Sequence, residues 1–164
     1  MGPMMTYTMQ MHRRLAIASL AFALLVPPVN RAIAVGWPLV TPGAEARDNA
    51  APHLRQSGTS AVQGAPVITV TQPDFSRALS NPMTFDIQFR AAPGSTINPS
   101  TFQAKYGWLG INITSRLLDH ATRTTNGLFA ANVNVPTGNH RISVSIADNR
   151  GRVGTRVVNL HVLR

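Results

Sequence analysis

Residues 141–146 read Arg-Ile-Ser-Val-Ser-Ile, and residues 158–162 read Val-Asn-Leu-His-Val. In both stretches every second side chain is apolar, and the side chains between them are polar or charged. Successive side chains of a β-strand point to opposite faces, so this alternation predicts two strands that each bury one face and expose the other. The sequence Asp148-Asn149-Arg150-Gly151 between them has the side chains and the glycine that favour a turn.

The same period of two recurs five times closer to the N-terminus. Turn-forming residues separate the stretches, and none of them carries an apolar stripe at helical spacing. The sequence therefore predicts an all-β fold, a seven-stranded antiparallel β-sandwich over residues 66–164. The five further strands are expected at residues 67–71, 83–89, 102–106, 111–117 and 128–135.

Residues 35–65 have a different composition from the predicted sandwich. Proline and glycine punctuate this stretch, and alanine, serine and threonine fill much of the rest. With few large apolar side chains to offset the entropy of ordering, the stretch is expected to be a flexible and mostly disordered linker. Trp37, Leu39 and Val40 are the exception, because their apolar side chains could dock against the sandwich.

The N-terminal 34 residues have the features of a secretory signal peptide. Arg13 and Arg14 precede the 12-residue apolar run 15–26, which is short compared with the roughly 20 residues that a membrane-spanning helix needs. Ala32-Ile33-Ala34 is a small-x-small cleavage signal, so we expect cleavage after Ala34. The mature protein would then be secreted or periplasmic, with no transmembrane segment. Translation could start at Met1 or at Met11.

The amino-acid composition excludes several kinds of site and favours one kind of partner. The 164 residues include no cysteine, which excludes a disulfide framework, a thiolate nucleophile and a cysteine-based zinc site. The formal charge is +9, and loss of the signal peptide would lower it to +6. This charge favours anionic partners such as envelope glycans, although it could also reflect an arginine-rich genome composition; export makes nucleic acid the least expected of these partners.

Four short stretches resemble the bacterial immunoglobulin-like (Ig-like) domains of envelope and secreted proteins. They are PxIxVxxP from Pro66, INPSTF from Ile97, PxGxHxIxV from Pro136 and ADxxG from Ala147. The resemblance implies an Ig-like sandwich and says little about activity. Asn98 and Arg152 stand where such domains usually have Asp and Asn, which weakens any calcium site of the family type.

Strand order predicts one candidate binding region. If seven strands alternate in direction, the loops after the second, fourth and sixth strands lie at one end of the sandwich. Guanidinium groups bind carboxylate, phosphate or sulfate, although these arginines could also be unrelated surface charges. The candidate binding residues at this end are Arg90, His120, Arg123, Arg150 and Arg152.

Trp108 is a further candidate, at the opposite end of the predicted sandwich. Its indole could stack on a sugar ring, or it could close the end of the core. No catalytic residues are predicted, because the sequence has no Gly-x-Ser-x-Gly motif and its histidines are scattered. No metal site or cofactor is expected either, since Asp148-Asn149 alone supplies too few oxygen ligands for a hard cation.

These observations predict an exported, non-catalytic module in the bacterial envelope or exterior, with a protein-binding or structural role. Its expected partner is another envelope or secreted protein, bound by addition of a strand to a sheet edge. The alternative is a module that binds a carbohydrate or an anionic glycan, and an enzyme or hydrolase accessory is a distant third.

Overall fold

The computed structural model of the chain describes residues 35–52, 62–124 and 126–164. Within these residues the protein consists mainly of β-strands arranged in two sheets, which confirms the predicted all-β class. The predicted signal peptide and residues 53–61 of the predicted linker lie outside the described residues. None of the helices in the described part is both long and apolar enough to cross a bilayer.

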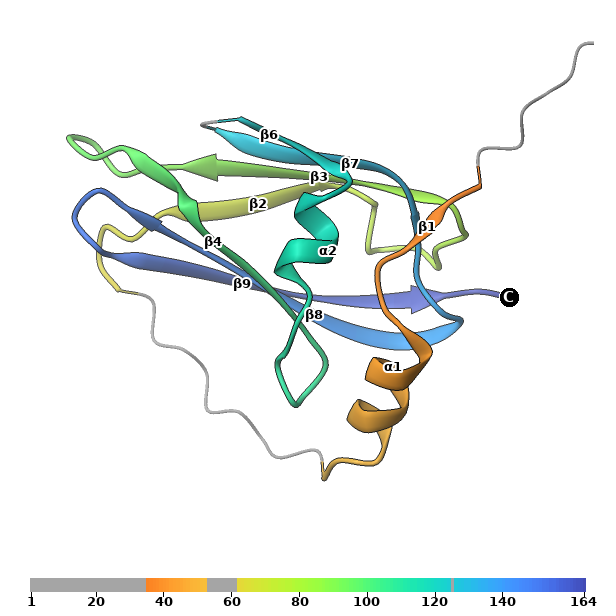
Figure 1. Cartoon of the computed structure of the whole chain (residues 1–164). Helices are drawn as coiled ribbons and strands as arrows, with labels where there is room; N and C mark the ends of the chain where they lie inside the picture. Colours follow the sequence, from red (N-terminus) through yellow and green to blue (C-terminus); the bar gives the residue numbers. More distant parts are fainter. Residues whose placement is uncertain (1–34, 53–61, 125) are drawn as a thin grey trace, which may run out of the picture. The chain divides into compact units, whose positions relative to one another are not determined.

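The two sheets face each other as the layers of a sandwich (Figure 1). One sheet has the strand order β1-β7-β3-β2, with β6 also paired to β7, and the other has the order β5-β4-β8-β9. Over the described ranges the elements in chain order are β1 (Trp37–Pro38), α1 (Pro42–Asn49), β2 (Val67–Gln72), β3 (Met83–Arg90), β4 (Ile97–Tyr106), β5 (Ile111–Asn112), α2 (Thr114–Leu118), β6 (Ala121–Thr124), β7 (Gly127–Asn134), β8 (Gly138–Asp148) and β9 (Val153–Val162).

The alternating side chains meet between the sheets in one apolar core. Phe85, Ile87 and Phe89 of β3 are buried from one side, and Ile142 and Val144 of β8 from the other. β8 and β9 pair along their whole length, from Gly138 opposite Val162 to Ala147 opposite Val153. The hairpin expected from the alternating stretches is therefore the longest paired unit of the fold.

The strand count differs from the prediction. The described residues form nine strands, not seven, because the short strands β1 and β6 are added. The predicted strand at 111–117 is wrong: only Ile111–Asn112 is strand, and Thr114–Leu118 is helix α2. Ile113 and Leu117 are four residues apart, so the helical turn also buries both of them.

The predicted linker is ordered over residues 35–52. β1 pairs in parallel with β7, which makes it an exception to the antiparallel pairing predicted for the sandwich. Leu39 and Val40 are 1% and 2% exposed and belong to the core. A few apolar side chains at the right places were enough to hold this segment, although its overall composition is typical of a linker.

Helix α1 follows because Thr41 and Pro42 favour a helix start. The Thr41 hydroxyl accepts a hydrogen bond from the amide of Ala44 at 3.2 Å, and proline occupies the first turn, where its missing N–H costs nothing. The helix then presents Asp48, which is 6% exposed, to the turn between β4 and β5. There its Oδ1 accepts a hydrogen bond from the amide of Leu109 at 2.9 Å.

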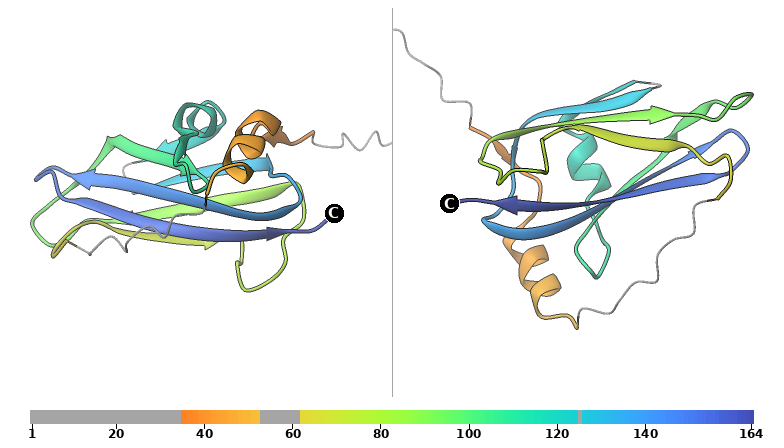
Figure 2. Two further views of the ribbon diagram at one scale, coloured as in Figure 1. Left: turned by 90° about the horizontal axis from the view of Figure 1, so that it is seen from below. Right: turned by 180° about the vertical axis from the view of Figure 1, so that it is seen from behind.

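The β4–β5 turn is shaped to receive that carboxylate. Gly107 has a φ of +70°, and a side chain at this position would overlap the Asp48 carboxylate. A glycine is therefore needed both for the backbone conformation and for the close approach of α1. The segment 35–52 is therefore an integral part of the sandwich at the end where the β4–β5 turn lies. Figure 2 shows α1 beside the sheet that contains β8 and β9.

Candidate functional site

Three connections meet at one end of the sandwich, which we call the arginine end. They are the β3–β4 loop (residues 91–96), the β8–β9 turn (residues 149–152) and the tip of the β6–β7 hairpin, of which Asn126 is described. Strand register brings them together, because Ile97 lies opposite Asp148 and Gln88 lies opposite Gly127 (Figure 1). The sequence-based expectation that Arg90, Arg150 and Arg152 share an end agrees with this arrangement.

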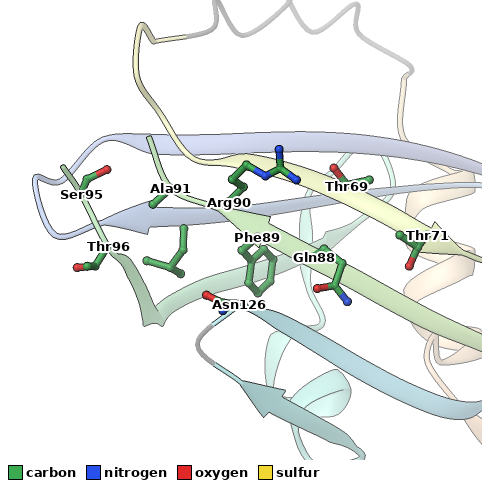
Figure 3. A pocket seen from close by; sticks show the side chains of 10 residues that line it. Thr69, Thr71, Gln88, Phe89, Arg90, Ala91, Ser95, Thr96 and Asn126 are labelled. Carbon is green, nitrogen blue, oxygen red and sulfur yellow. The ribbon is translucent and has the colours of Figure 1, made fainter. Parts of the chain in front are cut away.

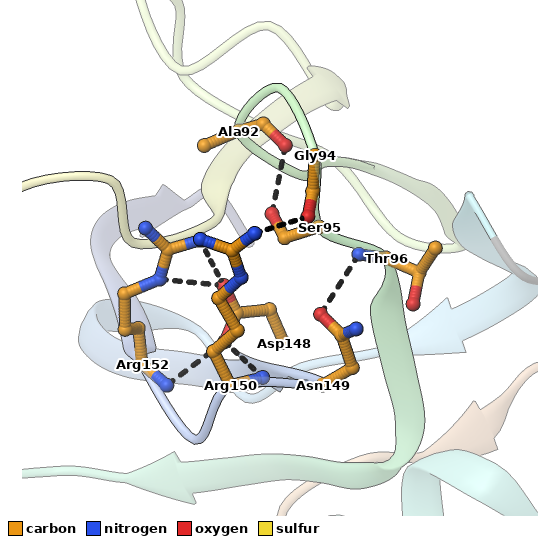
Figure 4. Close-up of polar contacts among 8 residues, drawn as sticks. All are labelled: Ala92, Gly94, Ser95, Thr96, Asp148, Asn149, Arg150 and Arg152. Carbon is orange, nitrogen blue, oxygen red and sulfur yellow. Dashed lines mark hydrogen bonds and ion pairs between the residues drawn. The ribbon is translucent and has the colours of Figure 1, made fainter.

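Asp148 organises the β8–β9 turn. Its side chain is fully buried, and its Oδ1 accepts hydrogen bonds from the amides of Arg150 at 3.0 Å and Arg152 at 2.9 Å (Figure 4). Its Oδ2 accepts a hydrogen bond from Nε of Arg152 at 2.8 Å and lies 2.6 Å from Nη2. Burial of the carboxyl raises its pKa, but the hydrogen bonds from Arg152 and Arg150 outweigh it and hold the pKa below the ordinary value.

The same turn is tied to the neighbouring loop. Nη2 of Arg150 donates a hydrogen bond to the carbonyl of Gly94 at 2.7 Å, and Oδ1 of Asn149 accepts one from the amide of Thr96 at 3.1 Å (Figure 4). The amide of Asn149 in turn donates to the carbonyl of Thr96 at 2.9 Å. Arg150 and Arg152 therefore hold the loops of this end in place, a role that the sequence alone did not reveal.

Arg90 has a different environment from these two arginines. Its side chain is exposed, and among the described residues no hydrogen bond or ion pair involves its guanidinium. It lines an open pocket of about 580 Å³ with residues of β2, the β3–β4 loop and the β6–β7 turn (Figure 3). Besides Arg90, the polar side chains of this lining carry hydroxyl or amide groups. They are Thr69, Thr71, Gln88, Ser95, Thr96 and Asn126.

Arg123 and His120 lie at different distances from this end. Arg123 is an exposed residue of β6 opposite Leu128, one residue before the strand's last residue, Thr124, at the arginine end. His120 precedes the other end of β6 and stacks on Trp37, with ring centroids 4.5 Å apart. The structure therefore does not bring His120 to the arginine end, because the expected fourth strand is helix α2.

The opposite end of the sandwich, which we call the Trp108 end, contains the β4–β5 turn, the β7–β8 connection and α1. The guanidinium carbon of Arg141 lies 4.6 Å from the ring centroid of Trp108, a cation–π contact that covers one face of the indole. Trp108 also lines a pocket of about 340 Å³, together with Phe75, Asn159 and His161.

Buried polar groups at the Trp108 end form a chain that sequence reasoning missed. The hydroxyl of Tyr106 lies 2.8 Å from Nδ1 of His140, and Nε2 of His140 lies 2.8 Å from the carbonyl of Pro136. Because a carbonyl only accepts, Nε2 carries the hydrogen and Nδ1 accepts from the tyrosine. Burial, with the negative charges of Glu45 and Asp48, raises the pKa of Tyr106 to about 12.

The alternation of apolar and polar residues offered one sequence signal for these buried polar groups. Tyr106 falls at an inward position of a predicted strand, and His140 stands two residues before Ile142, in phase with the inward residues of another; a polar side chain at such a position needs a buried partner. Across the ranges that the structure describes, no three His, Cys, Asp or Glu side chains gather as a metal site would require.

Comparison with known proteins gives no match: no family model, no curated protein sequence and no solved structure is significantly similar to the chain.

Proposed function

We propose that the chain is an exported, non-catalytic Ig-like module that binds a protein partner, or has a structural role, in the bacterial envelope or exterior. The observation that supports binding is the outer edge of β9. β9 is the last strand of its sheet, and among the described strands it pairs only with β8. An unpaired strand edge is a template for another extended segment.

The pattern of contacts shows which backbone groups of β9 face outward. Near its end, Leu79 pairs with the outer edge through the carbonyl of His161 and the amide of Leu163, both at 2.8 Å. By alternation, the backbone groups of Thr155, Val157 and Asn159 face the same way. In the described part of the chain these three residues have no strand partner on that side. Three outward-facing residues are enough for a short added strand.

Side chains next to this edge indicate the chemistry of the partner segment. Val153 and Val157 are 50% and 36% exposed on the outer face of the sheet. An extended segment of a partner protein with apolar side chains on the same face would cover both valines. The partner is therefore expected to supply a β-strand rather than a helix.

A substitution at Val157 tests this mode of binding. Val157→Pro removes an outward N–H and no hydrogen bond of the β8–β9 ladder, whereas Val157→Thr keeps the N–H and the β-branched shape. With a photo-crosslinker at Thr155 in cells of the source organism, we expect one discrete protein adduct in the native chain and in Val157→Thr. Loss of that adduct in Val157→Pro supports strand addition, and an equal adduct in all three chains contradicts it.

The proposed export of the protein can be tested separately. Processing after Ala34 would leave Val35 as the first residue, two residues before β1. Mass spectrometry of the protein from its native host should give a chain of residues 35–164 outside the cytoplasm. A full-length chain in the cytoplasm would contradict export.

A second candidate function is the binding of an anionic glycan. The observation that favours it is the pocket at the arginine end, whose polar lining consists of hydroxyls, amides and the guanidinium of Arg90. Such groups recognise and orient a hydroxyl-rich ligand. This candidate is compatible with a protein partner on β9, because the two surfaces are built from different residues.

A further inference from the structure

The pocket at the arginine end contains a cation, Arg90, that forms no ion pair with the described residues. Arg150 and Arg152 donate to Gly94 and Asp148, whereas the guanidinium of Arg90 has no hydrogen bond or ion pair with any residue that the structure describes. A guanidinium stays charged at every physiological pH, and its planar N–H fork matches a carboxylate. Arg90 is therefore prepared to bind an anion from solution.

Three other polar side chains of the lining are also without a partner among the described residues. They are the hydroxyls of Thr69 and Thr96 and the amide of Asn126, and they come from β2, the β3–β4 loop and the β6–β7 turn. In Figure 3 they stand around the pocket on different sides of Phe89. Together they offer donors and acceptors in several directions, which suits a ligand with several hydroxyl groups.

The rest of the lining is held in place by the protein. The hydroxyl of Thr71 donates to the carbonyl of Asp86 at 3.2 Å, and that of Ser95 donates to the carbonyl of Ala92 at 2.7 Å. Nε2 of Gln88 donates to the carboxylate of Asp86 at 2.6 Å. These bonds fix the walls, so less ordering is needed when a ligand enters.

The pocket also has an apolar part. Phe89 and Ile97 belong to the core, at 6% and 7% exposure, and both reach the pocket lining. An aromatic or aliphatic surface can contact the C–H groups of a sugar ring while polar side chains bind its hydroxyls. A volume of about 580 Å³ lies in the range of pockets that hold small organic ligands.

Charge decides the class of ligand. A phosphate group carries nearly two negative charges and is usually bound by several cations or amides, whereas Arg90 is the only charged residue among the described residues of this lining. We propose that the pocket binds a saccharide that carries a single carboxylate per ring, such as a uronic acid. Arg90 holds the carboxylate, and Thr69, Thr96 and Asn126 bind ring hydroxyls. The inference rests on the anionic-glycan form of the proposed function and names its ligand.

Calorimetric titration of the processed chain, residues 35–164, tests the proposal. The probes are digalacturonate, the neutral digalactoside and galactose 6-phosphate. We expect the digalacturonate to bind at least tenfold more tightly than the neutral sugar, because one charged hydrogen-bonded pair has about that effect. Binding should weaken as sodium chloride is raised, since Arg90 is exposed to solvent.

Two variants separate a site from general attraction to a basic protein. Arg90→Gln should weaken digalacturonate binding about tenfold or more, whereas Arg156→Gln removes the same charge from an exposed residue outside the pocket lining and should leave it unchanged. Arg90→Lys should fall between native and Arg90→Gln, because it keeps the charge and loses the fork. Unchanged melting temperatures would show that the variants are folded.

Three results would overturn the proposal. Equal weakening by Arg90→Gln and Arg156→Gln would show general electrostatic attraction. Tighter binding of galactose 6-phosphate than of digalacturonate would assign the pocket to phosphate. A complete lack of digalacturonate binding would remove the ligand class, while the photo-crosslinking test of β9 would still decide the protein-binding function separately.

Discussion

The two ends of the sandwich use buried polar groups for different purposes. At the Trp108 end, Asp48 ties the N-terminal segment to the β4–β5 turn, and the Tyr106–His140 pair joins β4 to β8. At the arginine end, Asp148 holds the β8–β9 turn through the amides of Arg150 and Arg152. Arg90, in contrast, lines an open pocket. The position of a charged side chain in a loop therefore does not by itself make it a ligand-binding group. Its role depends on whether another group of the protein already forms a hydrogen bond or ion pair with it.

The largest expected effect concerns the Trp108 end. Leu39→Ala should lower the free energy of unfolding by about 2–5 kcal/mol, because it leaves a cavity in the core that residues 35–52 help to form. Urea unfolding of the processed chain measures the change. Val35→Ala is the control, since Val35 is 91% exposed and should give no change. Equal stability of the two variants would mean that the segment does not belong to the fold.

The next effect concerns Asp148 at the arginine end. Its pKa is held below the ordinary value of about 4, so its contribution to stability is present at neutral pH and is lost as the pH falls below that value. Asp148→Asn should destabilise the protein at pH 7 and reduce the loss of stability between pH 7 and pH 3.

Urea unfolding at the two pH values measures both changes for Asp148→Asn. Asp119→Asn changes an exposed carboxyl without a hydrogen-bond partner among the described residues and is the matched control. An acid sensitivity of Asp148→Asn equal to that of the native chain would refute the role of this carboxylate.

Tyr106→Phe tests the buried chain at the Trp108 end. The variant leaves Nδ1 of His140 without its donor, which should cost about 1–3 kcal/mol of stability at pH 7. Because burial raises the pKa of Tyr106 from about 10 to about 12, the native chain should also lose stability as the pH rises through this interval. The variant should lack this component of the alkaline loss, and an identical pH profile for both proteins would contradict the assignment.

The smallest effect is expected for Arg150→Gln. Its guanidinium donates one hydrogen bond to Gly94 at an exposed site, so its loss should cost about 0.5–1.5 kcal/mol and leave digalacturonate affinity within twofold. Thermal unfolding and calorimetry measure the two quantities. A tenfold loss of affinity with unchanged stability would instead make Arg150 a ligand-binding residue.

Much of the sheet framework could be predicted from the sequence, because inward and outward side chains alternate along all of β3 and along most of β8 and β9. The stretch 111–118 could not, since Ile113 and Leu117 fit a strand at period two and a helix at four-residue spacing alike. Helix α1 did have a sequence signal: Thr41 followed by Pro42 and then Glu45 in the first turn. The linker-like composition of residues 35–65 led to a prediction of disorder in spite of this signal.

For the candidate site, the sequence predicts which loops lie at the same end of the sandwich. Alternating strand direction brings Arg90, Arg150 and Arg152 to one end, but it does not say which guanidinium is already bonded. That distinction depends on contacts of about 3 Å between Arg150 and Gly94 and between Arg152 and Asp148, and these are set by the turn conformations. Sequence patterns do not resolve side-chain geometry at this scale.

The difference between the two ends can be measured in one nuclear magnetic resonance titration of the processed, ¹⁵N-labelled chain with digalacturonate. Trp37 and Trp108 are the only tryptophans, and both lie away from the arginine end, so their indole N–H signals report on the other part of the molecule. We predict shifts at Thr69, Arg90, Thr96 and Asn126, with both indole signals unmoved. Shifts of the Trp108 indole with an unchanged arginine end would contradict the assignment of the ligand pocket.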